Sequence, residues 1–196
     1  MLEDARAARS QTAILSDTDA EALIFGAGGA ATAITWHWMR ADAPADRPAR
    51  LIITDRSDAR LAEIAAFHRT LGSSLPVTYV PVTDLTTSDQ LLAALPNGSL
   101  VINATGLGKD APGSPLSPAA QFPDQAIAFD LNYRGNLVFL DQARAASDRG
   151  VMAADGWVYF LHGWTRVIAE VFAIDIPVSG PGFDALSTIA RSAGRG

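Results

Sequence analysis

The sequence contains no cysteine, and Lys109 is the one lysine among its fifteen lysine and arginine residues. Without cysteine the chain forms no disulfide and no thiolate metal site, although this absence alone does not indicate a cellular compartment. The three histidines show no HxxH or HExxH spacing, so the sequence predicts no metal centre. We therefore look for function outside thiol and metal chemistry.

Long hydrophobic runs are also missing, because no stretch approaches the ~20 apolar residues of a membrane span. The N-terminal residues 1–6 mix charges and have no apolar core, which predicts no secretory signal and a cytoplasmic protein. The net charge of −6 argues against a broad nucleic-acid-binding surface. We expect neither nucleic acid nor a membrane as a partner.

Short apolar runs alternate with helix-like segments along the 196 residues. No hairpin turn signal separates the runs, which favours a parallel sheet covered on both faces. With right-handed crossovers, this pattern predicts a Rossmann-type α/β fold, a doubly wound parallel sheet of about six strands with helices on both faces. The expected strands lie near 22–26, 51–54, 77–80, 100–102, 126–129 and 151–153, and the helices near 29–40, 58–71, 86–95, 136–149, 156–172 and 183–192.

We expect a single domain over 1–196, because no interior linker is long enough to divide the chain. Its parts are a leading helix over 1–12, a core of strands and helices over 22–176, and a connector with a final helix over 177–196.

The first strand runs into the segment Gly26-Ala27-Gly28-Gly29-Ala30-Ala31, a G-x-G-x-x-A variant of the dinucleotide-binding fingerprint. The first glycine permits a tight turn, the second lets the backbone approach a pyrophosphate, and the final alanine lets the helix pack on its strand. Phosphates would then bind the unpaired N–H groups at the helix N-terminus, where the helix dipole favours negative charge. A glycine-rich turn can also be a plain connection, so other strand ends must decide.

Asp55 lies at the tip of the second strand, about two dozen residues beyond the glycine segment. A carboxylate there can accept both ribose hydroxyls of an adenosine and repels a 2′-phosphate, which favours NAD slightly over NADP. Arg56 and Ser57 favour NADP instead, since a guanidinium beside a hydroxyl can hold a 2′-phosphate. In the alternative interpretation, Asp55 and Ser57 only cap the next helix and Arg56 is solvated.

The fourth strand ends in Asn103-Ala104-Thr105-Gly106, whose small residues permit a flat ring to approach, although they also suit an ordinary turn. Asp130 ends the fifth strand and is a further candidate for the cofactor site. Tyr133 follows it and could bond a substrate hydroxyl, or it could be a buried tyrosine with a satisfied hydroxyl.

Three motifs in this order resemble the cofactor-binding half of the shikimate/quinate dehydrogenase family. The glycine loop 26–30 matches the loop of that family, 103–108 matches the segment that passes the nicotinamide, and 130–133 with 140–143 and 155–156 match the last strand, helix and turn. The resemblance extends over roughly residues 1 to 176 and is more specific than the glycine loop alone.

The resemblance implies hydride transfer between NADP or NAD and a shikimate- or quinate-like cyclic hydroxy acid, in aromatic amino acid biosynthesis. It places the pyrophosphate on Gly26, Ala27, Gly28, Gly29 and Ala30, and the adenosine-selecting position at 55–57, where NADP users often have Asn-Arg-Thr. It lines the nicotinamide with Asn103, Ala104, Thr105 and Gly156.

The sequence departs from the family pattern in ways that concern catalysis. It lacks the N-terminal substrate domain with its Ser-x-Ser/Thr clamp and its catalytic lysine–aspartate pair, so we assign no catalytic residue. Gly163 stands where the family has a substrate-contacting glutamine, so the substrate need not be shikimate.

Three functions remain open on this basis. The chain is the NAD(P)-binding portion of such an oxidoreductase and inactive alone, or a stand-alone module that works with a separate substrate-binding chain or senses the cofactor. In the second case we expect a homodimer, or pairing through an apolar face at the N-terminal helix and 156–192. A dehydrogenase of the methylene-tetrahydrofolate type is the third alternative, against which residues 130–133 argue.

Overall fold

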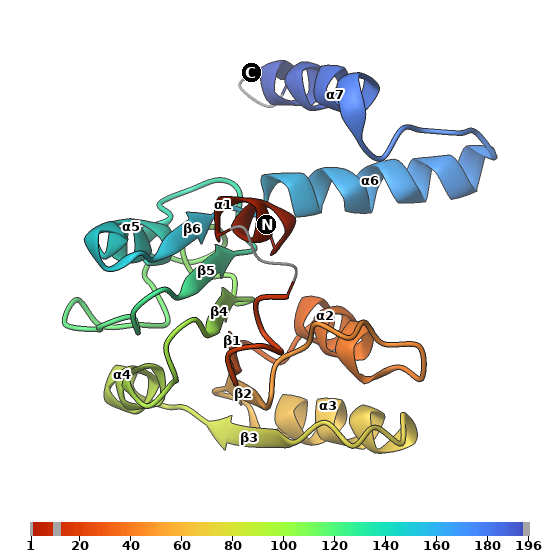
Figure 1. Ribbon diagram of the computed structural model, residues 1–196. Helices are drawn as coiled ribbons and strands as arrows, with labels where there is room; N and C mark the ends of the chain where they lie inside the picture. The colour runs from red at the N-terminus through yellow and green to blue at the C-terminus, as the bar shows by residue number, and fades with distance from the viewer. Residues whose placement is uncertain (1, 10–12, 194–196) are drawn as a thin grey trace. The chain divides into compact units, whose positions relative to one another are not determined.

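The computed structural model describes residues 2–9 and 13–193 (Figure 1). Its elements are α1 (Leu2–Arg9), β1 (Ala22–Phe25), α2 (Gly29–Met39), β2 (Leu51–Asp55), α3 (Asp58–Thr70), β3 (Val77–Pro81), α4 (Leu85–Ala93), β4 (Leu100–Asn103), β5 (Ile127–Asp130), α5 (Val138–Arg144), the 3₁₀ turn η1 (Ser147–Arg149), β6 (Met152–Ala154), α6 (Trp157–Phe172) and α7 (Gly180–Ala193). The chain divides into two compact units, Met1–Asp155 and Gly156–Gly196. The single domain expected over 1–196 stays a prediction.

The six strands form one parallel sheet in the order β3-β2-β1-β4-β5-β6. The chain moves from β1 through β2 to β3 and then returns to the other side of β1, so the strand order reverses between β1 and β4. Doubly wound sheets bind ligands beyond the carboxyl ends of the strands at such a reversal. The register aligns Phe25 with Asn103 and Asn103 with Asp130, so these strands end at one edge. The predicted Rossmann-type fold is confirmed.

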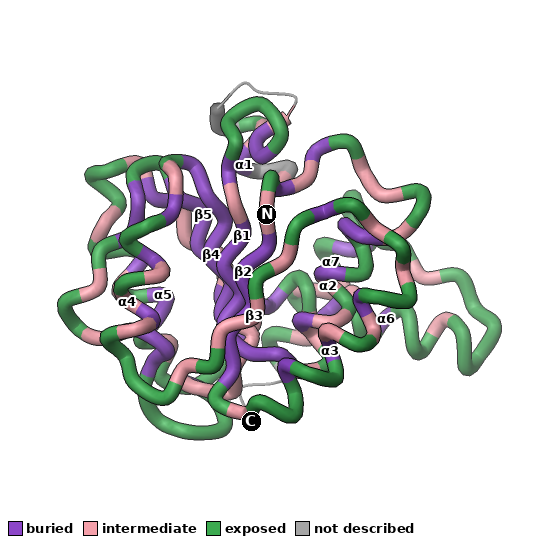
Figure 2. The backbone as a smooth tube through the Cα atoms, turned by 90° about the horizontal axis from the view of Figure 1, so that it is seen from below, coloured by how far each residue is buried: buried purple, intermediate pink, exposed green. Residues whose placement is uncertain are grey.

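Helices cover both faces of the sheet because strand side chains alternate between the faces. Ile24 and Ile53 pack on one face with residues of α2 and α3. Phe25 and its neighbours pack on the other face with Leu92 of α4 and Phe139 of α5. Figure 2 shows the buried strands between these two pairs of helices. The two buried layers hold the strand ends, and therefore the loops that follow them, in place.

The leading helix expected over 1–12 is observed as α1, while residues 1 and 10–12 lie outside the described residues. Asp46 fixes the segment after α1, since its carboxylate accepts hydrogen bonds from the backbone N–H groups of residues 14–16 at 2.8–3.2 Å and from Arg6 at 2.6 Å. Burial by itself would raise the pKa of Asp46, but these donors together hold it below its ordinary value.

The single helix expected over 136–149 is wrong. The chain instead forms the seven-residue α5 and, after it, the short turn η1. Gly150 ends this segment in the left-handed region, with φ 75°, and its N–H donates to the carbonyl of Ser147. The last turn is thus tightened into a 3₁₀ turn before β6 begins.

Candidate functional site

A pocket of about 460 Å³ opens at the carboxyl edge of the sheet, beside the reversal of strand order. It is formed by the ends of β1, β2 and β4, the segment after β3 and the loop after β4, all within the unit Met1–Asp155. Its lining includes Gly26, Asp55 and Ala104, which belong to three of the strand ends that the sequence analysis singled out. The structure therefore brings these distant segments together at one cavity.

Gly26 brings the end of β1 close to the backbone of the loop after β4. Its φ of +100° lies in the left-handed region, and a Cβ added to it would lie 2.8 Å from the carbonyl oxygen of Ala104. The backbone is tied on both sides, because Gly26 N donates to Thr54 O at 2.7 Å and Ala104 N donates to Phe25 O at 2.8 Å. Only glycine fits here without moving the loop after β4.

Gly28 is different, because it faces open space. A Cβ added to Gly28 would meet no atom within 4 Å, and its φ of −84° is available to any residue. It is the N-cap residue of α2, where no side chain caps the helix and no acidic residue stands in the first turn. The first N–H groups of a helix lack partners within the helix, so this uncapped end next to the pocket can bind an anion.

Asp55 contacts the glycine loop directly. Its Oδ2 accepts a hydrogen bond from the backbone N–H of Ala27 at 2.9 Å, and its Oδ1 accepts one from the N–H of Ser57 at 2.9 Å. The residue is 9% exposed at the pocket wall. The carboxylate that the sequence analysis placed on a ribose thus also holds the loop that precedes α2.

Two arginines, Arg56 and Arg60, also line the pocket. Ser57 caps α3 between them, since its side chain accepts from the N–H of Arg60 at 3.4 Å. Arg56 precedes this N-cap residue and Arg60 lies in the first turn of α3, so both follow the carboxyl end of β2. Asp84 adds negative charge from the segment after β3, so the lining of the pocket carries both signs.

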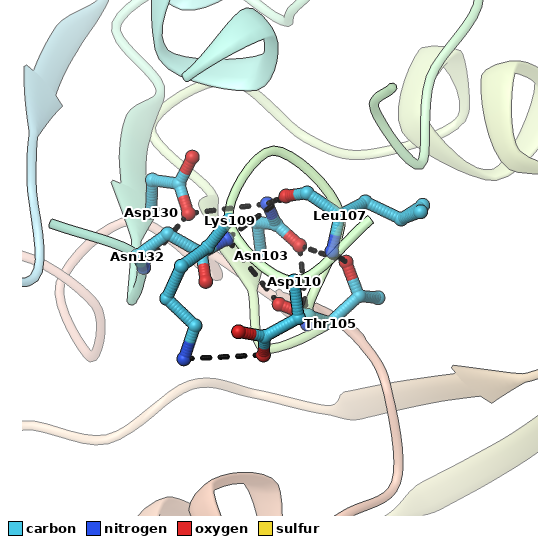
Figure 3. Close-up of polar contacts among 7 residues, drawn as sticks. All are labelled: Asn103, Thr105, Leu107, Lys109, Asp110, Asp130 and Asn132. Carbon is cyan, nitrogen blue, oxygen red and sulfur yellow. Dashed lines mark hydrogen bonds and ion pairs between the residues drawn. The ribbon is translucent and has the colours of Figure 1, made fainter. Parts of the chain in front are cut away.

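A hydrogen-bond network behind the pocket joins the ends of β4 and β5 (Figure 3). The side chain of Asn103 donates to Asp130 Oδ1 at 3.1 Å and accepts from the Thr105 hydroxyl at 2.6 Å. Asn132 donates from its side chain to the carbonyl oxygens of Thr105 at 3.3 Å and Leu107 at 2.9 Å. The network fixes the turn at 104–107 that forms one wall of the pocket.

Asp130 is fully buried at the centre of this network, where it also accepts from the N–H of Asn132 at 3.0 Å. Burial raises the pKa of its carboxyl, which the hydrogen bonds from Asn132 and Asn103 only partly offset. Its Oδ2 has no hydrogen-bond partner among the described residues. Asp130 therefore organises the loop around Asn103 and presents no surface to the pocket.

The loop after β4 also carries the lone lysine. Lys109 Nζ pairs with Asp110 Oδ2 at 3.2 Å (Figure 3), and Asp110 in turn lines the pocket. A Cβ on Gly106 would lie 2.9 Å from Asp110 Oδ2, so the turn is also closely packed on this side.

The predicted site residues fall into three groups by position. Those that line the pocket are Gly26, Gly28, Asp55, Arg56, Ala104, Thr105 and Gly106. Those that belong to the same strand ends and turns without lining it are Ala27, Gly29, Ala30, Ser57, Asn103 and Asp130. Tyr133 does not line the pocket and has the guanidinium of Arg134 5.7 Å from its ring centre, while Gly156 is the N-cap residue of α6 in the second unit.

The sequence analysis missed the contributions of α3, of the segment after β3 and of α4. Arg60, Thr83, Asp84 and Ser88 all line the pocket. A usable signal was present, because residues 82–84 directly follow a predicted strand and its carboxyl end must reach the same edge. Asp110 was missed because nothing in a Pro/Gly/Ser-rich loop predicts which way it folds.

Among residues 2–9 and 13–193, no group of three or more His, Asp or Glu side chains is placed to hold a metal ion. Within the same part of the chain, no helix is long and apolar enough to cross a bilayer.

The fold and the glycine loop define a Rossmann-like α/β protein, and sequence comparison gives the relatives. No protein-family model matches the chain. The NADP⁺ shikimate dehydrogenase of Caulobacter vibrioides is 32% identical over 135 residues, which are 68% of this chain and 42% of that enzyme. The corresponding enzyme of Symbiobacterium thermophilum is 32% identical over 143 residues, 72% of this chain and 45% of that enzyme. The chain thus spans less than half the length of these curated relatives.

Two solved structures share the fold. Shikimate 5-dehydrogenase from Listeria monocytogenes, in complex with shikimate and NAD, has a TM-score of 0.61 at 21% identity, over 90% of this chain and 58% of that chain. Quinate dehydrogenase from Corynebacterium glutamicum, in complex with NAD, has a TM-score of 0.63 at 18% identity, over 89% and 56%. The chain is a distant homologue of shikimate/quinate dehydrogenases. It covers less than half the length of each curated relative, which is consistent with their NAD(P)-binding domain only. The resemblance predicted from the three motifs is confirmed.

Proposed function

We propose that the pocket binds NAD or NADP, and that the chain is the dinucleotide-binding portion of a shikimate-dehydrogenase-like oxidoreductase. The observation that carries this proposal is Gly28, a glycine that no steric or conformational demand of the fold requires. Its bare backbone at the uncapped N-terminus of α2 leaves room for a diphosphate. The homology to shikimate dehydrogenases supports the same ligand.

Three parts of the site would each hold a different part of the dinucleotide. The N–H groups at the start of α2 hold the pyrophosphate against Gly28 and its neighbours Gly29 and Ala30. The adenosine lies toward Asp55 and Arg56. The nicotinamide lies toward the turn at 104–106, which the network around Asn103 keeps in place. Gly156 stays a proposed nicotinamide contact on the resemblance alone.

The choice between NAD and NADP depends on charge at the adenosine end. Asp55 would disfavour a 2′-phosphate, whereas Arg56 and Arg60 would attract one, and all three line the pocket. Relatives include enzymes named for NADP⁺ and structures solved with NAD. We keep both cofactors in the proposal.

When bound, the nicotinamide cofactor supplies or accepts the hydride exchanged with a hydroxyl or keto group of a shikimate- or quinate-like cyclic acid. This chain contributes the binding and orientation of the cofactor. The catalytic lysine–aspartate pair implied by the resemblance is not in the sequence, so we propose that the chain alone turns over negligibly. Proton transfer and substrate positioning are together worth many orders of magnitude in rate.

The test is a fluorescence titration with NADH and with NADPH. We expect at least one of them to bind with a dissociation constant in the micromolar to low millimolar range, at about −8 to −4 kcal/mol. Binding of neither nucleotide would contradict the proposal.

A second candidate function, a stand-alone binding module that works with a separate substrate-binding chain, is favoured by α6. Apolar side chains recur along this helix and remain exposed, among them Trp164 at 56%, Val167 at 54%, Val171 at 69% and Phe172 at 68%. Exposed apolar groups of this size at helical spacing favour a partner surface. Light scattering tests this, since a monodisperse monomer over a range of concentrations argues against self-pairing, and a purified substrate-binding chain that changes the mass argues for the module.

A further inference from the structure

Another pocket, of about 310 Å³, lies at the opposite edge of the sheet from the candidate site. Its lining comes from parts of residues 15–19, 45–49 and 74–76, which precede β1, β2 and β3. Because parallel strands all begin at one edge and end at the other, this pocket lies at the amino edge. All three segments belong to the unit Met1–Asp155, and the two pockets share no lining residue.

Hydrogen bonds hold the three segments of this amino-edge pocket together. The carboxylate of Asp46 accepts from the backbone N–H groups of residues 14–16, which ties the first segment to the second. The N–H of Leu51 donates to the carbonyl oxygen of Pro76 at 2.9 Å, which ties the start of β2 to the third segment. The fold therefore forms this cavity before any ligand binds, as in most small-molecule sites.

One residue of each charge lines the amino-edge pocket, namely Arg47 and Asp19. Neither side chain forms an ion pair or a hydrogen bond with any other residue that the structure describes, and they do not pair with each other. By contrast, Asp46, next to Arg47 in the chain, is paired with Arg6. The guanidinium of Arg47 and the carboxylate of Asp19 are therefore both available to a ligand.

The apolar and polar residues of this lining differ in exposure. Leu15, Pro48 and Leu75 are buried, whereas Ser16 and Ser74 are exposed. The cavity volume lies at the lower end of the roughly 300–1,000 Å³ of small-molecule sites. A ligand that suits this pocket is small, carries both charges and has a short apolar part.

We propose that the amino-edge pocket binds a small zwitterion with an apolar side chain, a free α-amino acid. Arg47 binds the carboxylate, because a guanidinium offers two parallel N–H donors to one carboxylate, and Asp19 binds the ammonium group. A plain anion would be repelled by Asp19 and a plain cation by Arg47. The site goes beyond the proposed function and does not depend on it, since the dinucleotide pocket has other lining residues.

The first test is an NMR titration of the full chain with L-leucine as the probe. We expect a dissociation constant on the order of 1 mM, with amide shifts at 15–19, 45–49 and 74–76 and none at 26–31. Leucine amide lacks the carboxylate and 4-methylpentanoate lacks the ammonium group. Each of these should bind about fivefold more weakly than leucine, because each loses one ion pair.

The second test removes each charge from the protein. Arg47→Gln and Asp19→Asn should each weaken leucine binding about fivefold. Asparagine suits the φ of 51° at position 19, and neither wild-type side chain has a partner among the described residues, so both variants should melt like wild type. Arg144→Gln is the matched control, since Arg144 pairs with Asp141 at an exposed site outside the pocket.

The variants and the probes also check one another. Asp19→Asn should not weaken 4-methylpentanoate, which has no ammonium group, and Arg47→Gln should not weaken leucine amide, which has no carboxylate.

Two results would overturn the proposal. One is the absence of shifts at the amino-edge pocket in leucine up to about 20 mM. The other is equal binding of leucine and 4-methylpentanoate, which would make the pocket a plain anion site. If neither NADH nor NADPH binds, the proposed function fails, while the leucine titration still decides this inference.

Discussion

At the scale of single residues, two glycines of one loop have opposite reasons for being glycine. Gly26 is required by the fold, since its φ is +100° and its place against Ala104 leaves no room for a Cβ. Gly28 satisfies no such requirement, because its surroundings are open and its backbone is extended. Mutating each glycine alone therefore tests the stability of the fold and the binding of the ligand separately.

Gly28→Ala is expected to leave the free energy of unfolding within about 0.5 kcal/mol of wild type and to weaken dinucleotide binding about tenfold or more. Gly26→Ala should instead destabilise the fold by about 1–3 kcal/mol, because alanine is strained at this φ and meets the carbonyl of Ala104. Thermal unfolding and nucleotide titration of both variants check this. Gly163→Ala, on α6 with no atom within 4 Å of the added Cβ, is the control that should leave affinity unchanged. Equal binding by Gly28→Ala and wild type would contradict the site.

His68 joins two helices and a strand through a buried chain of hydrogen bonds. Its Nε2 lies 2.8 Å from the hydroxyl of Thr35, which also reaches the carbonyl oxygen of Ala31 at 2.8 Å. Its Nδ1 forms a hydrogen bond with the hydroxyl of Tyr79 at 2.7 Å. The neutral ring is fully paired, and burial lowers the pKa of His68 below its usual 6.5.

The pH dependence of stability follows from this shift. Because the unfolded chain binds the proton more readily, the contribution of His68 is complete above pH 6.5 and is lost as the pH falls from there toward the lower folded-state value. The melting temperature of wild type should therefore fall over this range more steeply than that of His68→Gln, which does not titrate. Parallel pH profiles for the two proteins would show that protonation of His68 costs the fold nothing.

At the scale of elements, the sequence predicted all six strands of the sheet because each contains a short apolar run, and the four inner strands β1, β2, β4 and β5 are buried. Parallel strands buried on both faces leave little ambiguity in such a pattern. The ends of helices were harder, as α5 shows. It ends at Arg144 with Ala145 as its C-cap residue in the right-handed helical region, so no glycine or proline in the sequence marks this stop.

The position of a site residue was predictable where the residue ends or directly follows a strand. The hydrogen-bond partners of its side chain were not predictable. Gly26, Asp55 and Ala104 line the pocket because the topology takes every strand end to one edge. Asp130 follows a strand in the same way, yet it turns inward to Asn103 and Asn132, which only the packed structure reveals. Spacing locates the residue, whereas local hydrogen bonds decide what the side chain faces.

The exposed apolar row of α6, defined by Trp164, Val167, Val171 and Phe172, leads to a prediction at the same scale. The double variant Val167→Glu with Val171→Glu should fold with little loss, because both side chains are more than half exposed in the wild type. If the row pairs with another chain, the variant should lose that association at concentrations where wild type associates. Analytical ultracentrifugation checks this, with Arg166→Glu on the same helix as the charge control.

At the scale of the whole molecule, the chain matches less than half the length of its curated relatives and has a Rossmann-like fold, which is consistent with their NAD(P)-binding domain. The proposed dinucleotide site lies at the carboxyl edge of the sheet, between β1 and β4. A second pocket of about 310 Å³, lined by parts of residues 15–19, 45–49 and 74–76, provides an internal comparison.

Hydrogen–deuterium exchange with and without saturating NADH or NADPH tests this claim most directly. The account predicts slower exchange on binding at residues 25–31, 54–60 and 104–111, which surround the pocket at the carboxyl edge, and unchanged exchange at 45–49 and 74–76. Protection at the second pocket with none at the glycine loop, or no protection anywhere at saturating nucleotide, would contradict it.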